Sequence, residues 1–119
     1  MVDPADLDLW LPEVEEHDYQ AAKNYLSIAK PKINPERLRK AELTERRAND
    51  ILRACRQPVL PMSDPGVHKN LLRALAGKKL SPVLIVDGDI ADGYHRVSFA
   101  YWVSPSLLVP CKVVHYSAP

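Results

Sequence analysis

The segment SPVLIVDGDIADG, residues 81–93, constrains the possible fold more than any other part of the chain. The apolar run from Val83 to Val86 is typical of a buried strand, and the Asp87-Gly88 pair that follows favours a type I′ hairpin turn. Residues 90–91 then return as a second short strand, and Asp92-Gly93 leads into a predicted helix over residues 94–103. The sequence therefore predicts a hairpin whose second strand runs directly into a helix.

Helix patterns precede this hairpin along the chain. Residues 17–29 place apolar side chains at helical intervals. Two further segments begin at Asn34-Pro35 and Asp64-Pro65, and each combines an N-cap residue with proline at the first helical position. We therefore expect two helices in the N-terminal third and another helix over residues 65–76.

The helix over residues 65–76 is expected to end at Gly77 and to bury one stripe of side chains, Val67, Leu71, Leu72 and Leu75. A shorter helix is expected over residues 49–56, with Asn49 as its N-cap. Short strands over residues 44–48 and 109–114 complete the set. This pattern predicts an α+β protein in which helices flank a small mixed sheet.

The length of 119 residues fits a single compact domain with a substantial core. We expect residues 1–43 to form an acidic segment and a helical arm, and residues 44–119 to form the core. No apolar run reaches the roughly 18 residues that a membrane span needs. Two cysteines are too few for a disulfide framework, so Cys55 and Cys111 are interpreted as small buried side chains of a cytoplasmic protein.

Charge is distributed unevenly along the chain, although the formal net charge is only +1. Residues 1–20 contain seven acidic residues and no Lys or Arg, which argues against a secretory or mitochondrial leader. Residues 37–56 contain seven basic and three acidic residues. These segments either lie solvated, face each other across the fold, or leave the basic stretch free for an external anion.

The residues with the clearest chemical potential are DGYHR, at positions 92–96. Backbone N–H groups at a helix start are unpaired and the helix dipole is positive there, so this position suits an anion. Gly93 allows close approach to the backbone, Arg96 offers a planar fork for phosphate, and His95 offers a second donor. Asp92 is suited to cap the helix or to hold Mg²⁺ brought by a nucleotide. The alternative is an ordinary turn, with Arg96 paired internally to Asp92 or to an acid of the arm.

Residues 78–114 resemble the core of the ParB/sulfiredoxin superfamily. In that superfamily a helix ending in Gly precedes an apolar strand, a short return strand, a G-x-x-R turn that opens a helix, and a strand reading I/V-P-x-x-V. The matching segments here are residues 71–77, 82–86, 90–91, 93–96 and 109–114. The DGYHR turn is most similar to the D-G-H-H-R of the free serine kinases.

The resemblance implies a phosphate-binding turn made of Gly93, Tyr94, His95 and Arg96. It implies Asp92 and His95 as catalytic candidates, and ATP, ADP or CTP with Mg²⁺ as the ligand of a phosphotransferase or NTPase. Sulfiredoxins carry their reactive cysteine where this chain has Tyr94, so that chemistry is excluded at this position.

Other side chains are weaker candidates. Four further basic residues could reach the same anion: Arg53, Arg56, Lys78 and Lys79. By resemblance, Glu45 and Asp50 are the nearest candidates for a catalytic carboxylate. No metal site formed by the protein alone is expected, because the histidines, among them His17, lack metal-ligand spacing.

Three functions remain open from the sequence. The first is a nucleotide-binding protein of ParB/sulfiredoxin-like fold. The second is a non-catalytic regulatory module of toxin–antitoxin or partition type, which binds a protein partner or a second copy of itself. The third is a ParB-like nuclease that contacts nucleic acid through residues 37–56, which the low net charge disfavours. None of the three involves a membrane.

Overall fold

A computed structural model describes residues 8–31, 34 and 36–115 of the chain. This part of the chain forms five helices and four strands in the order α1 (Glu16–Ala29), α2 (Glu36–Lys40), β1 (Thr44–Arg47), α3 (Ala48–Ala54), α4 (Pro65–Leu75), β2 (Val83–Val86), β3 (Asp89–Asp92), α5 (Tyr94–Val103) and β4 (Leu108–Val114). The expected α+β class is confirmed, and so are the short first strand and the helices on both sides of the hairpin.

The strands form one mixed sheet in the order β1-β4-β2-β3. β2 and β3 pair antiparallel, β4 lies parallel to β2, and β1 pairs antiparallel with β4. The β2–β3 turn has φ of 50° at Asp87 and 79° at Gly88, which are the two positive values of a type I′ turn. The hairpin and the mixed sheet predicted from the sequence are therefore both confirmed.

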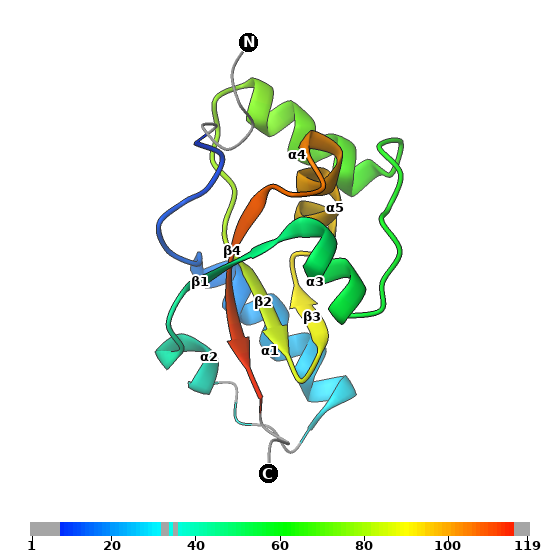
Figure 1. Cartoon of the computed structure of the whole chain (residues 1–119). Coiled ribbons are helices and arrows are strands. Elements are labelled where there is room, and N and C mark those ends of the chain that lie inside the picture. Colours follow the sequence, from blue (N-terminus) through cyan, green and yellow to red (C-terminus); the bar gives the residue numbers. More distant parts are fainter. Residues whose placement is uncertain (1–7, 32–33, 35, 116–119) are drawn as a thin grey trace.

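Helices cover both faces of this sheet (Figure 1). Alternate residues of β2 divide between the two faces: Val83 and Ile85 pack with α3 and α5, whereas Leu84 and Val86 pack with α1 and α2. All four residues of β2 are consequently buried, as is typical of a strand covered on both faces. The helices of the predicted arm thus form one layer of the hydrophobic core.

The helix α4 begins and ends as predicted, but its buried stripe differs. The Asp64 carboxylate accepts hydrogen bonds from the N–H groups of Gly66 and Val67, and Gly77 adopts φ of 78° after the last turn. Val67 is buried and Leu71 half-buried, but Leu72 and Leu75 are exposed, so half of the predicted stripe was wrong. The helix packs on its neighbours through a face that includes Asn70 and Ala74 instead.

The helix α3 is capped differently from the prediction. Its N-cap residue is Arg47, and Asn49 lies inside the helix. The N–H groups of Ala48 and Asn49 donate at 3.0 Å to the carbonyl oxygens of Leu107 and Pro105, which precede β4. The helix start is therefore satisfied by the backbone of a distant loop, and no local side-chain cap is needed.

Two further expectations concern burial and membranes. Cys55 and Cys111 are both buried in the core cluster between the sheet and α3 and α5, as interpreted from the sequence. Among the described residues, no helix has the length and apolar character required to cross a membrane.

Candidate functional site

The turn between β3 and α5 places a glycine in a conformation that other residues rarely adopt. Gly93 has φ of 110°, and a Cβ atom at this position would lie 2.9 Å from both Nη2 of Arg96 and a methyl carbon of Val83. The N–H of Val97 donates to the carbonyl of Gly93 at 2.9 Å, which is the first bond of the helix. The N–H groups of residues 94–96 therefore have no acceptor within α5.

The side chain of Arg96 is held by two carboxylates. Its Nη2 donates to Oδ2 of Asp92 at 2.7 Å and its Nη1 donates to Oδ1 of Asp18, in α1, at 3.1 Å. The carbonyl oxygen of Pro82 lies 3.4 Å from Nη2. Only 14% of the Arg96 side chain and 4% of the Asp18 side chain are exposed. Arg96 is therefore paired internally, both with Asp92 and with an acid of the N-terminal arm, as the alternative interpretation of the sequence expected.

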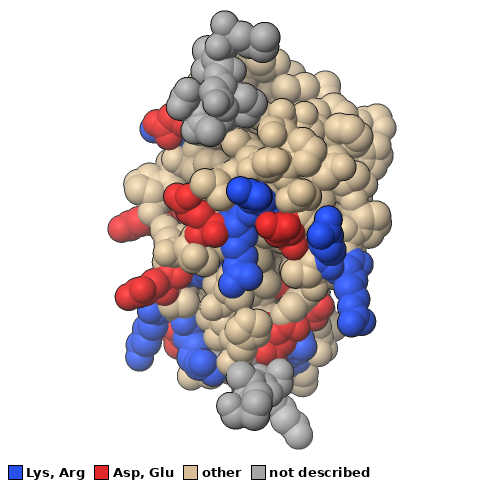
Figure 2. Space-filling view, in the orientation of Figure 1, with Lys and Arg blue, Asp and Glu red and all other residues tan. Residues whose placement is uncertain are grey.

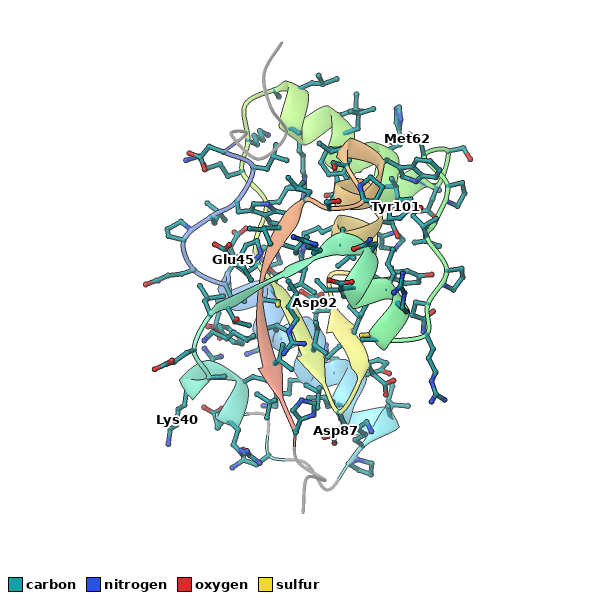
Figure 3. The ribbon with its side chains drawn as sticks, viewed as in Figure 1. Lys40, Glu45, Met62, Asp87, Asp92 and Tyr101 are labelled. Atoms are coloured by element: carbon teal, nitrogen blue, oxygen red, sulfur yellow. The ribbon has the colours of Figure 1, made fainter. Side chains whose placement is uncertain are left out.

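Asp92 and Asp18 share one guanidinium, so the single positive charge of Arg96 cannot neutralise both carboxylates when both are ionised. Burial raises the pKa of Asp92 from 3.8 to about 6, and the charge and hydrogen bond of Arg96 offset only part of this effect. Burial also opposes ionisation of Asp18, but the Ser81 hydroxyl and Arg96 outweigh it and hold the Asp18 pKa below its usual value. Figure 3 shows Asp92 at the end of β3 nearest α5, with Asp87 at the opposite end of the hairpin.

His95 and Tyr94 also contact other parts of the chain. The Tyr94 hydroxyl donates to the carbonyl of Pro58. Nδ1 of His95 lies 2.8 Å from Oδ2 of Asp64, the residue that caps α4. The N–H of Val67, opposed in part by burial, helps to keep the Asp64 pKa below its usual value, so this carboxylate is ionised and His95 donates through Nδ1. The other ring nitrogen, Nε2, is the one that Asp64 does not contact.

The packing around His95 explains why α4 and α5 meet at their N-termini. A Cβ atom on Gly66, in the first turn of α4, would lie 2.4 Å from Nδ1 of His95. The glycine therefore leaves the space that the imidazole ring fills. Asp64 is the functional candidate that sequence reasoning missed, because its role as a helix cap was recognised and its contact with His95, 31 residues away, was not.

The weaker basic candidates are exposed or contact other parts of the chain. Lys79 pairs with Asp8 at 2.6 Å, Lys78 is exposed, and Arg53 is exposed on α3. Arg56 lines a groove with Asp87 and Gly88, at the other end of the β2–β3 hairpin from Asp92.

The carboxylates suggested by resemblance also lie elsewhere. Asp50 is exposed on α3, and Glu45 lies on β1. β1 and β3 are the opposite edges of the sheet, so the strands that carry Glu45 and Asp92 are separated by roughly 14 Å, three strand spacings. The structure thus does not bring Glu45 beside the DGYHR turn.

A group of possible metal ligands lies close to the Arg96 cluster. One atom each from Glu15, His17 and Asp18 lies within 4.8 Å of the other two. The spacing of these residues was not recognised in the sequence as a metal-binding pattern. Arg96 already donates to Oδ1 of Asp18, however, and its positive charge opposes a cation beside this carboxylate.

Among the described residues, one ion pair joins the acidic segment, residues 1–20, to the basic stretch, residues 37–56. Arg39 in the basic stretch pairs with Glu16 of α1, whereas Arg46, Arg47 and Arg53 are exposed with no carboxylate within ion-pair distance in the described part of the chain. Figure 2 shows acidic and basic side chains interspersed on the face that carries β1 and α3. This face has no continuous surface of one sign.

The turn can thus offer backbone donors, an oriented imidazole and two carboxylates, and its arginine is available only if an internal ion pair opens. Searches for similar proteins found no matching family model, curated protein or solved structure.

Proposed function

We propose that the protein binds the phosphate groups of a nucleotide at the N-terminus of α5, within a ParB/sulfiredoxin-like fold. One observation supports this most directly: β3 passes through the left-handed Gly93 straight into a ten-residue helix whose first N–H groups lack intrahelical acceptors. The strands and helices from β2 to β4 also follow one another in the order that the sequence resemblance implies.

Each residue of the turn has a role in this proposal. The N–H groups of residues 94–96 and the Arg96 guanidinium bind phosphate oxygens. Asp92 supplies the kind of oxygen ligand that nucleotide-bound Mg²⁺ prefers. His95, oriented by Asp64, exchanges a proton through Nε2. ATP, ADP and CTP are the candidate ligands, and phosphoryl transfer or nucleotide hydrolysis is the reaction class that these groups fit.

Phosphate binding by Arg96 requires Asp18 to release Nη1, so α1 competes with the nucleotide. Thermal unfolding with ATP, ADP, CTP and GTP plus Mg²⁺ tests this. A nucleotide at about 100 times its Kd should add about 2.7 kcal/mol to the stability of the folded protein. The ligand-induced rise should be larger in Asp18→Asn, and the exposed control Glu42→Gln should match the wild type. Absence of a rise in both wild type and Asp18→Asn would overturn the proposal.

A second candidate is a non-catalytic module that binds a protein partner. It is favoured by the observation that Tyr94, His95 and Arg96 all have internal partners. This function predicts no response to any nucleotide in the same unfolding experiment. If no nucleotide stabilises the protein but it binds DNA in a salt-sensitive way, the nucleic-acid function is supported instead, through the exposed arginines of β1 and α3.

A further inference from the structure

A lysine lies buried on β4, a central strand of the sheet, and does not belong to the DGYHR turn. Lys112 belongs to β4, pairs across with Leu84 of β2, and is only 8% exposed. Its Nζ donates to the carbonyl of Arg39, in α2, at 2.9 Å and lies 5.3 Å from the centre of the Tyr19 ring. Lysine is rarely buried unless an anion accompanies it.

No such anion is supplied by the part of the chain that the structure describes, where no carboxylate lies within 4.0 Å of Nζ. The neighbouring Arg39 differs, because both of its terminal nitrogens donate to the Glu16 carboxylate. A carbonyl oxygen and an aromatic face stabilise an ammonium, but they do not neutralise it. Among the described residues, Lys112 is therefore a buried cation without a carboxylate partner in contact.

Lys112 lines a cavity of about 560 Å³ between α1, α2 and β4. This volume lies within the range of small-molecule sites. Lys112, Tyr19 and Arg39 line it, together with the apolar side chains of Val14 and Leu43. The cavity thus places one buried cation beside a partly apolar wall.

We propose that this cavity binds a small monocarboxylic acid, with the carboxylate on Nζ of Lys112 and the body of the acid against Val14 and Leu43. The ion pairing within the cavity selects the ligand class. The formal charges of the lining balance, with Arg39 and Lys112 against Glu13 and Glu16. Arg39 is already paired with Glu16, whereas Nζ of Lys112 donates only to a backbone carbonyl, so Nζ is the contact left for a single carboxylate. A phosphate dianion would bring a second negative charge beside Glu16 and Glu13, which line the same cavity. This site uses none of the residues of the DGYHR turn, and the proposal does not depend on nucleotide binding.

Amide resonances of the full chain, titrated with sodium benzoate at constant ionic strength, test the proposal. We expect saturable shifts around Tyr19, Ala41 and Lys112, with a Kd of about 1 mM or lower. Benzamide has the same shape without the charge and should produce no saturable shifts there. Sodium phosphate should bind more weakly than benzoate.

Matched lysine variants identify the residue responsible. Lys112→Met should weaken benzoate binding by about ten- to a hundredfold, the loss expected for one charge-assisted contact. Lys69→Met, which alters an exposed lysine of α4, should leave the affinity unchanged. Three results would each overturn the proposal. Lys112→Met could bind benzoate as tightly as the wild type, the wild type could respond equally to benzoate and benzamide, or phosphate could bind more tightly than benzoate. If Lys112→Met does not fold, the wild-type comparison of benzoate with benzamide and phosphate decides.

Discussion

A guanidinium buried between two carboxylates stabilises a fold only while its partners remain in place, because each charge has lost its hydration. Arg96 is such a group, with Asp92 four residues before it and Asp18 on a different layer of the molecule. The Nε atom of Arg96 is buried without a hydrogen-bond partner in the described structure, so the cluster is not fully satisfied. It joins α1 to the start of α5, and a phosphate could replace only one of its contacts.

Arg96→Ala should therefore lower the free energy of unfolding, by about 3 kcal/mol or more, because it leaves the buried Asp18 carboxylate and the half-buried Asp92 carboxylate without this cation. Urea unfolding at neutral pH measures this. Arg53→Ala removes an exposed arginine of α3 and should change stability by less than about 0.5 kcal/mol. A loss for Arg96→Ala as small as for Arg53→Ala would show that the cluster is open in solution.

The cluster of Asp18, Asp92 and Arg96 also predicts that the stability of the fold depends on pH. The pKa of Asp92 is raised from 3.8 to about 6, so between these values the folded protein holds a proton that the unfolded chain releases. The contribution of Asp92 to stability is consequently greatest at acid pH and is lost as pH rises through about 6, by about 1–3 kcal/mol in total.

Urea unfolding from about pH 7 down to about pH 4, on wild type and Asp92→Asn in parallel, measures this contribution. The stability of the wild type relative to the variant should increase as pH falls. The comparison matters because Asp18, with a lowered pKa, has the opposite effect below its unfolded value of 3.8. Parallel stability curves for the two proteins would contradict the raised pKa of Asp92.

At the scale of helices and strands, local patterns predicted most of the elements. The hairpin followed from Asp87-Gly88, and the start of α4 followed from Asp64-Pro65, since both signals act within a few residues. The start of α3 could not be predicted in this way, because its N–H groups bond to carbonyls more than 50 residues away along the chain. The exposed side of α4 was also misassigned, because leucine is favourable on either face of a helix and packing against α5 decides which face is buried.

The candidate site was predictable only in part for the same reason. The turn from Asp92 to Arg96 is contiguous in sequence, and its glycine and helix start were located correctly. Asp18 and Asp64 reach the turn from 78 and 31 residues away, so no spacing rule identifies them as the partners of Arg96 and His95. Sequence reasoning offered an acid of the arm as one alternative, and the structure identifies it as Asp18.

The junction of α4 and α5 depends on Asp64, which caps one helix and binds a side chain of the other. Asp64→Ala should reduce stability by about 1–2 kcal/mol through loss of the cap, and should also release His95. Asp64→Asn is the matched control, because asparagine caps a helix equally well but carries no charge to orient the imidazole. Thermal unfolding and the His95 ring resonances report the two effects. Equal stability of all three proteins would show that the cap contributes nothing.

For the molecule as a whole, the sheet is enclosed between two helical layers, and the N-terminal helices supply one of them (Figure 1). Ala22 and Leu26 of α1 pack with Leu84 and Val86 of β2 and with Leu38 of α2. An acidic cover over the basic stretch would not need this apolar interface. Removing α1 should therefore expose one face of the sheet rather than simply uncover residues 37–56.

Two single variants of α1 test whether this helix is part of the core. Leu26 is fully buried beneath it, whereas Ile28, two residues further on, is 87% exposed. Leu26→Ala should lower the free energy of unfolding by about 2–5 kcal/mol, through lost burial and the cavity left in its place. Ile28→Ala removes a side chain of similar size from the same helix and should change it by less than about 0.5 kcal/mol. Cooperative urea unfolding, followed by circular dichroism, gives both values. If the two variants were equally stable, α1 would be a detachable arm, and Arg96 would lose the Asp18 contact whenever that arm opened.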